Sequence, residues 1–223
     1  MTAACALACA QPLPDPVPIP APEDLAARLQ AGSEFSQPQL IQFKWRYSGR
    51  DGRFSGEGGV RFNPPDSIRL DLIEPGGSGV QSAVLIDDEV RYIGERRIQL
   101  PPPTFLWAVF GFFRPPAGIV PEGTRRGERT QLVYRLTALE RVTFDFDSAG
   151  HLIEAERLLD GDAVQEVRLK IRDSGDSGGF AWPDEARFRD LVEFIEVRVE
   201  VVSARDHASF ESEIFEVAAT RQR

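Results

Sequence analysis

The chain has 223 residues, of which 42% are hydrophobic, including 15 Phe, 3 Trp and 3 Tyr. That share supports a sizeable buried core and excludes a mainly disordered chain. The formal net charge of -9, from 35 acidic and 26 basic residues, argues against nucleic acid or an anionic lipid surface as the main partner. No uncharged apolar run approaches the roughly 20 residues of a membrane-spanning helix.

The first ten residues are small and apolar, and they lack the basic start of a secretory signal peptide. They end in Ala6-Leu7-Ala8-Cys9, which resembles the bacterial lipobox, where a small residue precedes a cysteine that becomes lipidated. The lipobox usually has leucine three positions before the cysteine, where this chain has Ala6. We interpret residues 1–10 as a truncated, lipobox-like signal segment, with Cys9 as the lipidation site and Cys5 as the alternative.

Proline occupies every second position from Pro12 to Pro22, which predicts an extended, semi-rigid segment that packs neither as helix nor as sheet. Residues 11–22 are therefore expected to be a tether that holds a domain away from a membrane. We assign residues 23–218 to one folded domain and residues 219–223 to a tail. Together with Cys9, the tether predicts a periplasmic protein that is lipid-anchored to the outer membrane.

A short amphipathic helix is predicted from Pro22 onward, because acidic residues occupy its first turn and Gly32 follows its last apolar residue. From residue 41 to residue 47 the apolar residues recur at every second position, which indicates a half-buried strand. Asp51-Gly52 is typical of a tight hairpin turn. Further strands are predicted at 54–62, 68–72, 80–86 and 90–93, and their short connections indicate an antiparallel meander.

The segment from Thr104 to Phe113 is apolar on every side and is predicted to be a helix of about three turns, with Thr104 as its N-cap and Pro115-Pro116 as its stop. After a polar loop around Arg125, strands are predicted at 132–136, 142–146, 152–159, 164–171, 186–188 and 195–201. About eleven strands predict a mainly β (α+β) fold, in which a curled antiparallel sheet forms an incomplete barrel around the two helices. Gly56 to Gly59 are expected to mark a bulge or a sharp bend.

The order of these elements resembles the LolA/LolB-like superfamily of outer-membrane lipoprotein carriers and receptors. The residues that carry the resemblance are Phe43-Lys44-Trp45-Arg46-Tyr47, Gly56-Glu57-Gly58, Arg61-Phe62 and, above all, Pro64-Pro65-Asp66-Ser67-Ile68-Arg69-Leu70-Asp71-Leu72. The resemblance implies an incomplete antiparallel barrel whose apolar interior holds the acyl chains of lipoproteins, with the apolar helix as a lid.

Apolar residues of the first strands and of the apolar helix are the candidates for the lining of that interior. Such a lining gains about 25 cal/mol for each Å² of acyl chain removed from water. The candidates from the sheet are Phe43, Trp45, Tyr47, Val60, Phe62, Ile68, Leu70 and Leu72. The candidates from the lid are Phe105, Leu106, Trp107, Val109, Phe110, Phe112 and Phe113. The same side chains could instead simply fill the barrel.

The superfamily also implies an arginine that locks the lid, and Arg46, Arg61 and Arg69 are the candidates in the first strands. All three alternate with apolar residues, so we expect their guanidinium groups to point outward into solvent. Gly118-Ile119-Val120 is the candidate for the membrane-inserting loop of a receptor. The choice between carrier and receptor depends on Cys9, since within the superfamily the receptor is lipid-anchored and the carrier is free.

Gly175-Asp176-Ser177-Gly178-Gly179 matches the serine motif of chymotrypsin-like proteases, but a nucleophilic serine needs a histidine base and an orienting acid. The chain has only His151 and His207, and neither lies in that family's Ala-Ala-His-Cys context. Without a nearby cysteine, these two distant histidines also predict no zinc site. We therefore expect no catalytic residue, no metal and no cofactor, and the chain is predicted not to be an enzyme.

The resulting hypothesis is a bacterial envelope protein that binds the acyl chains of lipoproteins or free lipid, in lipoprotein transport to, or insertion in, the outer membrane. Its expected partners are those acyl chains, the membrane reached through the lipid anchor, and a transport-system protein. Nucleic acid is not expected, and the chain is expected to be a monomer. The alternative is a non-catalytic structural or interaction lipoprotein whose barrel is packed solid.

Overall fold

The computed structural model describes residues 14–77, 79–86, 88–94, 98–171 and 180–216. They form one antiparallel sheet of thirteen strands, with two α-helices and two short 3-10 helices. Among these residues, no helix has the length and apolarity needed to cross a membrane. The described residues do not include Cys5, Cys9, the Gly175–Gly179 motif or the predicted tail.

The elements in chain order are β1 (Val17–Pro18), α1 (Pro22–Gly32), β2 (Gln39–Gly49), β3 (Gly52–Asn63), β4 (Ser67–Ile73), η1 (Pro75–Gly77), β5 (Val80–Ile86), β6 (Glu89–Ile93), α2 (Pro103–Val109), β7 (Glu122–Arg126), β8 (Arg129–Arg135), β9 (Glu140–Phe146), β10 (Leu152–Leu159), β11 (Asp162–Ile171), β12 (Pro183–Asp190), β13 (Ile195–Asp206) and η2 (Ser212–Phe215).

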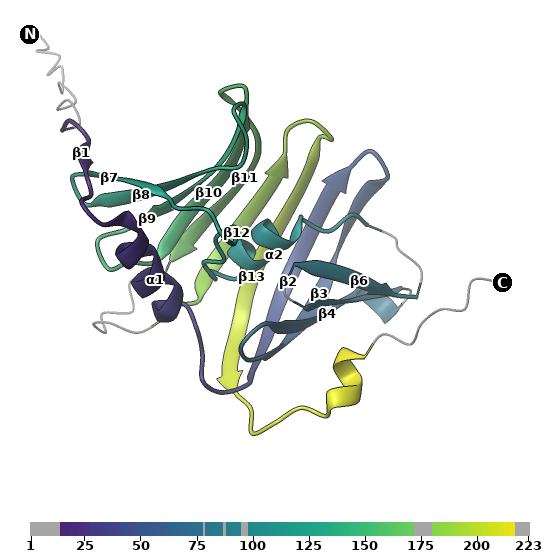
Figure 1. Cartoon of the computed structure of the whole chain (residues 1–223). Helices are drawn as coiled ribbons and strands as arrows, with labels where there is room; N and C mark the ends of the chain where they lie inside the picture. The colour runs from purple at the N-terminus through teal and green to yellow at the C-terminus, as the bar shows by residue number, and fades with distance from the viewer. Residues whose placement is uncertain (1–13, 78, 87, 95–97, 172–179, 217–223) are drawn as a thin grey trace, which may run out of the picture.

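Across the sheet the strands follow the order β1-β7-β8-β9-β10-β11-β12-β13-β2-β3-β4-β5-β6. The pairing of β13 with β2 joins two antiparallel meanders into one sheet (Figure 1). The mainly β class is confirmed, but the expected incomplete barrel is not found: the described sheet is neither closed nor strongly curled. Its outermost strands, β1 and β6, each have one neighbour and do not meet, so thirteen strands extend as an open sheet.

Two strands were not expected from the sequence, and they pair with one another at one edge of the sheet. In β1, Val17 lies opposite Arg125 of β7 and Pro18 lies opposite Thr124. The expectation that the proline-rich segment stays out of the sheet is therefore wrong for Val17 and Pro18. Proline is tolerated there because an edge strand leaves one row of backbone donors unused.

Gly56 and Gly58 do not mark a bulge, since the β2–β3 register runs without a shift from one end to the other. Trp45 lies opposite Gly56, and Phe43 lies opposite Gly58. A Cβ atom added at Gly58 would lie 2.3 Å from Cζ of Phe43, which is inside van der Waals contact. Gly58 thus makes room for the Phe43 ring, whereas a Cβ atom at Gly56 would overlap the Ile73 carbonyl of β4.

The apolar helix α2 is shorter than expected, and Thr104 is not its N-cap. It begins at Pro103, with Pro102 in the N-cap position and no side-chain cap, and Leu106 N–H donates to the Pro102 carbonyl at 2.8 Å. Its end is set by Gly111, whose φ of 84° leaves the helical region, and not by the later prolines. By contrast, α1 spans Pro22–Gly32 and confirms the predicted start and stop.

The alternation of side chains gives the sheet one apolar face and one polar face. The apolar face, which we call the inner face, packs against α2, which contacts β10, β11 and β12 and lies across the middle of the sheet (Figure 1). One continuous core cluster includes α2 and inner-face residues from most of the long strands. The opposite, outer face carries the charged residues of the same strands.

Replacing Gly58 with alanine should destabilise the fold, because the new methyl group would overlap the Phe43 ring. Overpacking of this kind typically costs about 1–3 kcal/mol. Gly59 provides the matched control, since a Cβ atom there meets only the Ile41 carbonyl at 3.8 Å. Urea unfolding should therefore show a lower midpoint for Gly58→Ala and a change within about 0.5 kcal/mol for Gly59→Ala. Equal midpoints for the two variants would contradict the described β2–β3 packing.

Candidate functional site

All fifteen residues predicted to line the interior are buried in one cluster. None exposes more than 6% of its surface, and Val60, Phe62 and Phe113 are fully buried. The eight strand residues lie on the inner face of β2, β3 and β4, and the seven others lie in α2 or in the turn that follows it. The structure thus brings together the two groups that the sequence could only place separately.

The α2 segment, defined as residues 103–113, contacts both halves of the sheet. On one side the Phe110 ring lies 5.7 Å from that of Phe43 on β2, and the Phe112 ring lies 4.8 Å from that of Phe62 on β3. On the other side, Phe113 lies 4.9 Å from Phe144 of β9. The α2 segment therefore fills the space over the inner face by ring packing.

Several interior residues of the second half of the chain were missing from the predicted lining. They follow the alternation of their strands, which was visible in the sequence, and they are Leu132, Tyr134, Val142, Phe144, Phe146 and Phe188. Tyr134 differs from the others because its hydroxyl is buried and has no hydrogen-bond partner among the described residues. Burial raises the pKa of Tyr134 to about 12, so the hydroxyl stays protonated and can donate to an acceptor.

At the end of the sheet near α1, a group of partly buried aromatic rings covers the interior. Phe35 stacks on Trp182 with ring centroids 5.0 Å apart, and Phe180 lies 4.5 Å from Phe35. Phe180 also stacks on Phe112 at 5.3 Å, which ties this group to the α2 segment. A cavity of 20 Å³ lies beside it, bordered by Phe113, Phe180 and other residues. That volume holds about one water molecule and no acyl chain.

None of the three candidate locking arginines lies at the α2 segment. Arg61 and Arg69 both pair with Asp71 on the outer face, and Arg46 is exposed there, as the alternation predicted. The arginine that holds the α2 segment is Arg114, which immediately follows it. Its guanidinium group donates to Glu34 at 2.9 Å and to the Pro65 carbonyl, and it lies 5.1 Å from the centre of the Trp107 ring.

Arg114 therefore links the α2 segment to the α1–β2 connection and to the β3–β4 turn. One further contact supports the same link: the Phe113 N–H donates to the Ser33 hydroxyl at 3.2 Å. Arg114 could not be recognised from the sequence, because an arginine before two prolines has the appearance of a loop residue. The ring contacts between the α2 segment and the sheet are apolar, and apolar contacts are not directional.

Exposed apolar side chains gather at one end of the sheet. Of the ten large hydrophobic residues that are exposed among the described residues, six lie in or beside the turns that precede β7 or connect β8–β9, β10–β11 and β12–β13. We call them the tip rim: Val120, Leu139, Leu159, Leu191, Val192 and Phe194. Antiparallel pairing places the β8–β9, β10–β11 and β12–β13 turns at the same end, which is the top of Figure 1.

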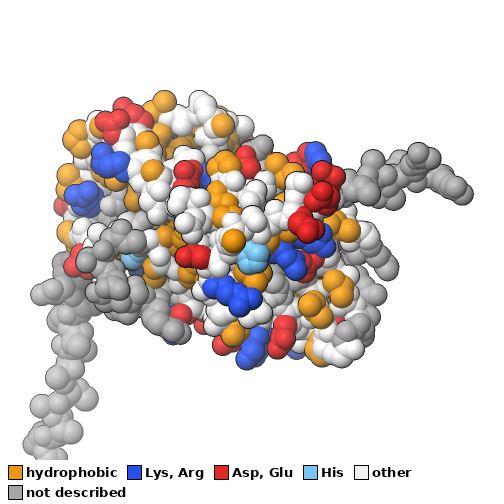
Figure 2. All heavy atoms as spheres, turned by 90° about the horizontal axis from the view of Figure 1, so that it is seen from below, with side chains coloured by type: hydrophobic (Ala, Val, Ile, Leu, Met, Phe, Trp, Pro, Cys, Tyr) orange, Lys and Arg blue, Asp and Glu red, His pale blue; other side chains and the backbone are white. Residues whose placement is uncertain are grey.

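Two residues of the tip rim, Phe194 and Val120, are strongly exposed. Phe194 is 74% exposed, and its main described partner is Arg50, whose guanidinium carbon lies 5.9 Å from the ring centre. Val120, in the candidate membrane-inserting loop, is also 74% exposed, whereas Ile119 packs against the core. At the opposite end, hydrophobic side chains are interspersed with charges of both signs (Figure 2).

The histidines do not form a catalytic or metal site with one another in the described structure. His151 lies in the β9–β10 turn, where its Nδ1 atom is 3.1 Å from Asp147. His207 stacks on Phe210 at the far end of β13. One group of three potential metal ligands does come together among the described residues, namely Glu154, Glu156 and Glu166 on the outer face of β10 and β11.

Comparison of the sequence with protein-family models and with curated proteins found no match. Solved structures do match. A LolA superfamily protein from Nitrosomonas europaea has a TM-score of 0.59 and 11% identity, over 89% of this chain and 98% of the other. A putative outer membrane lipoprotein-sorting protein domain from Vibrio parahaemolyticus has a TM-score of 0.52 and 8% identity, over 86% of this chain and 94% of the other.

These matches cover almost the whole length of both structures, and their low identities mean that it is the fold that is shared. They confirm, at the level of the fold, the resemblance predicted from the element order and from residues 43–75. The described part of this chain has structural neighbours in the LolA superfamily and shares their fold.

Proposed function

We propose that this chain is a bacterial envelope protein that binds the acyl chains of lipoproteins or other lipids between its α2 segment and the inner face of its sheet, without covalent chemistry. The proposal places the fifteen predicted lining residues around the ligand. It also places the protein in the periplasm, held to the outer membrane through Cys9 or Cys5. The fold shared with a lipoprotein-sorting domain supports the envelope role.

The observation that carries the proposal is the composition and attachment of the α2 segment. Its seven largest apolar side chains fill the inner face, and polar links from Arg114 and to Ser33 hold it to neighbouring connections. An acyl chain could take over the same apolar contacts if these links opened. Each CH₂ group so buried contributes about 0.8 kcal/mol.

The Tyr134 hydroxyl gives the interior a polar group for such a ligand. It lies near Phe113, with the two rings 6.4 Å apart, and an unpaired buried hydroxyl is energetically costly. An ester or amide carbonyl next to an acyl chain would supply the missing acceptor. A purely hydrocarbon ligand would leave the hydroxyl unpaired.

The second candidate function is a structural or interaction protein with a solid core, and the dense packing favours it. The described cavity beside Phe113 is only 20 Å³, and the α2 segment occupies the space that a ligand would need. The two functions therefore differ in whether the α2 segment can leave the inner face without unfolding the sheet.

Acyl lipid should co-purify with the full chain from a bacterial envelope fraction, and native mass spectrometry with lipid extraction should detect it. Changing Trp107 and Phe110 to serine should remove the lipid, because both side chains line the proposed site. Phe210→Ser is the matched control, since it removes an aromatic ring that stacks on His207 outside the interior and outside the tip rim. Circular dichroism checks the fold of each variant. An apo mass that persists after lipoprotein is added would instead favour the solid-core function.

Arg114→Ala should increase the opening of the α2 segment. The lost charge-assisted hydrogen bonds and cation–π contact are together worth about 1–2 kcal/mol, which corresponds to roughly a tenfold change in an opening equilibrium. Hydrogen exchange of residues 103–113 measures that change. Arg50→Ala is the control, because Arg50 also has an ion pair and a cation–π contact but lies at the tip rim. Unchanged exchange in Arg114→Ala would show that Arg114 does not hold the segment.

The tip rim should bind the surface of a zwitterionic bilayer, because apolar side chains on adjacent turns can enter the interface together. In vesicle flotation with phosphatidylcholine, the chain with Cys5 and Cys9 changed to serine should bind, and Val192→Ser with Phe194→Ser should weaken binding at least about tenfold. Val202→Ser is the control, since Val202 is 59% exposed and lies outside the rim. Equal flotation of both variants would exclude the tip rim as the contact.

A further inference from the structure

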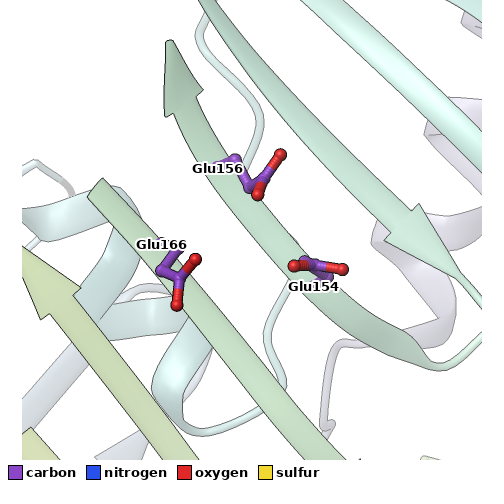
Figure 3. A group of neighbouring side chains, drawn as sticks. All are labelled: Glu154, Glu156 and Glu166. Atoms are coloured by element: carbon purple, nitrogen blue, oxygen red, sulfur yellow. The ribbon is translucent and has the colours of Figure 1, made fainter. Parts of the chain in front are cut away.

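The outer face of the sheet carries a compact group of carboxylates that the proposed function does not use. Glu154 and Glu156 lie on β10, and Glu166 lies on β11 directly opposite Glu156 (Figure 3). One carboxylate oxygen from each residue lies within 4.8 Å of those from the other two. We call these three residues the carboxylate cluster. Glu166 is buried, whereas the other two are partly buried.

Two of these carboxylates already have arginine partners. Arg168 Nε donates to Glu154 at 2.8 Å, and Arg189 pairs with Glu166. Glu156 has no partner in a described hydrogen bond or ion pair. Asp145 adds a fourth carboxylate on β9, opposite Glu154. Four carboxylates thus gather in this part of the outer face, two of them paired with guanidinium groups, and Arg126 and Arg129 line the same groove.

The pKa values of two of these carboxylates, Glu156 and Asp145, are raised. Burial, followed by repulsion from Glu154, Glu166 and Asp145, raises the pKa of Glu156. Burial also raises the pKa of Asp145, although Gln131 donates to it. Ionised Glu156 and Asp145 are therefore less favourable here than in water, and a bound cation would relieve this cost.

A second observation, independent of the acidic residues, comes from Thr143 on β9. Its neighbours Val142 and Phe144 are in the core, so the Thr143 side chain lies on the outer face, directly opposite Glu156. Opposed residues on one face have Cβ atoms about 5 Å apart. Thr143 is only 5% exposed, and its Oγ1 atom is buried without a hydrogen-bond partner. The Thr143 hydroxyl is thus a buried, unpaired polar group on the outer face, on the residue that pairs with Glu156 of the carboxylate cluster.

The cluster is accessible from solvent and has dimensions that suit a large divalent cation. Glu154, Glu156 and Asp145 line an outer-face groove of 930 Å³, whose lining also includes Pro14, Arg126 and Arg129. Calcium binds oxygen ligands at about 2.3–2.6 Å, so two ligands on opposite sides of one ion lie about 5 Å apart. Oxygens within 4.8 Å of one another can therefore surround one calcium ion with little rearrangement. Magnesium requires a smaller, near-octahedral site.

We propose that Glu154, Glu156 and Glu166, with the Thr143 hydroxyl, form a binding site for one divalent cation of the calcium type on the outer face of β9–β11. All three strands that carry these groups also carry inner-face core residues. Binding would therefore hold three strands together from outside the core. The proposal does not depend on lipid binding, because no residue of the cluster lies on the inner face.

Isothermal titration of the full chain with CaCl₂, after removal of bound metal with a chelator, tests the proposal. We expect one ion per chain, with a Kd of about 0.1–1 mM in about 0.1 M NaCl, and a higher melting temperature in calcium. Glu156→Gln should weaken binding at least about tenfold, as expected for a lost charged ligand. The apo form of this variant should fold, since it removes a charge that burial disfavours. Thr143→Val, which keeps the shape of the side chain, should weaken binding by a smaller factor.

Glu128→Gln is the matched control, because Glu128 lines the same groove but lies outside the carboxylate cluster. It should change the affinity by less than about twofold. Loss of binding to the same extent in Glu128→Gln and Glu156→Gln would reveal diffuse counterion attraction and would overturn the site. So would the absence of both heat and a melting-temperature shift at about 10 mM CaCl₂, or unchanged affinity in Glu156→Gln.

Discussion

The packing of the α2 segment on the inner face is the interaction on which the rest of the described structure depends. A helix that is apolar on every side is stable only when all its sides are covered. The sheet covers one side, and the rings of Phe35, Phe180 and Trp182 extend the cover near α1. Conversely, a thirteen-stranded sheet without α2 would expose an apolar face far larger than soluble proteins usually tolerate. Helix and sheet therefore stabilise each other.

The same alternation that builds the inner face assembles the groups of the outer face. Because Val142 and Phe144 point inward, Thr143 must point outward, and the β9–β10 register then brings it opposite Glu156. The β10–β11 register adds Glu166 in the same row. Strand register alone thus brings together residues that are ten and thirteen positions apart in the chain. The two faces are coupled, since a shift of one residue in register would invert both.

Much of the fold could be predicted because it depends on period-two patterns, as in the strand from Ile41 to Tyr47. The edge pair β1–β7 could not, since Gly123 occupies an inward position of β7 and leaves no apolar signal there. The lining residues of the first strands were predicted by alternation, whereas Arg114 was missed because its partners, Glu34 and Pro65, come from distant connections. The pair Glu154 and Glu156 was visible as outward residues of one strand, but Glu166 joins them only through strand register.

The dense interior also limits how a ligand could bind. An acyl chain that enters must replace contacts made by side chains such as Phe110 and Phe112, which are as apolar as the chain itself. The net binding free energy would be the difference between the free energies of the two apolar packings, reduced by the cost of breaking the Arg114 links. It would not be the full gain of removing hydrocarbon from water. When this free-energy difference is small, a bound acyl chain is released readily and is not held. The open sheet and its filling helix therefore suit a protein that takes up a lipid chain and passes it on better than one that stores it.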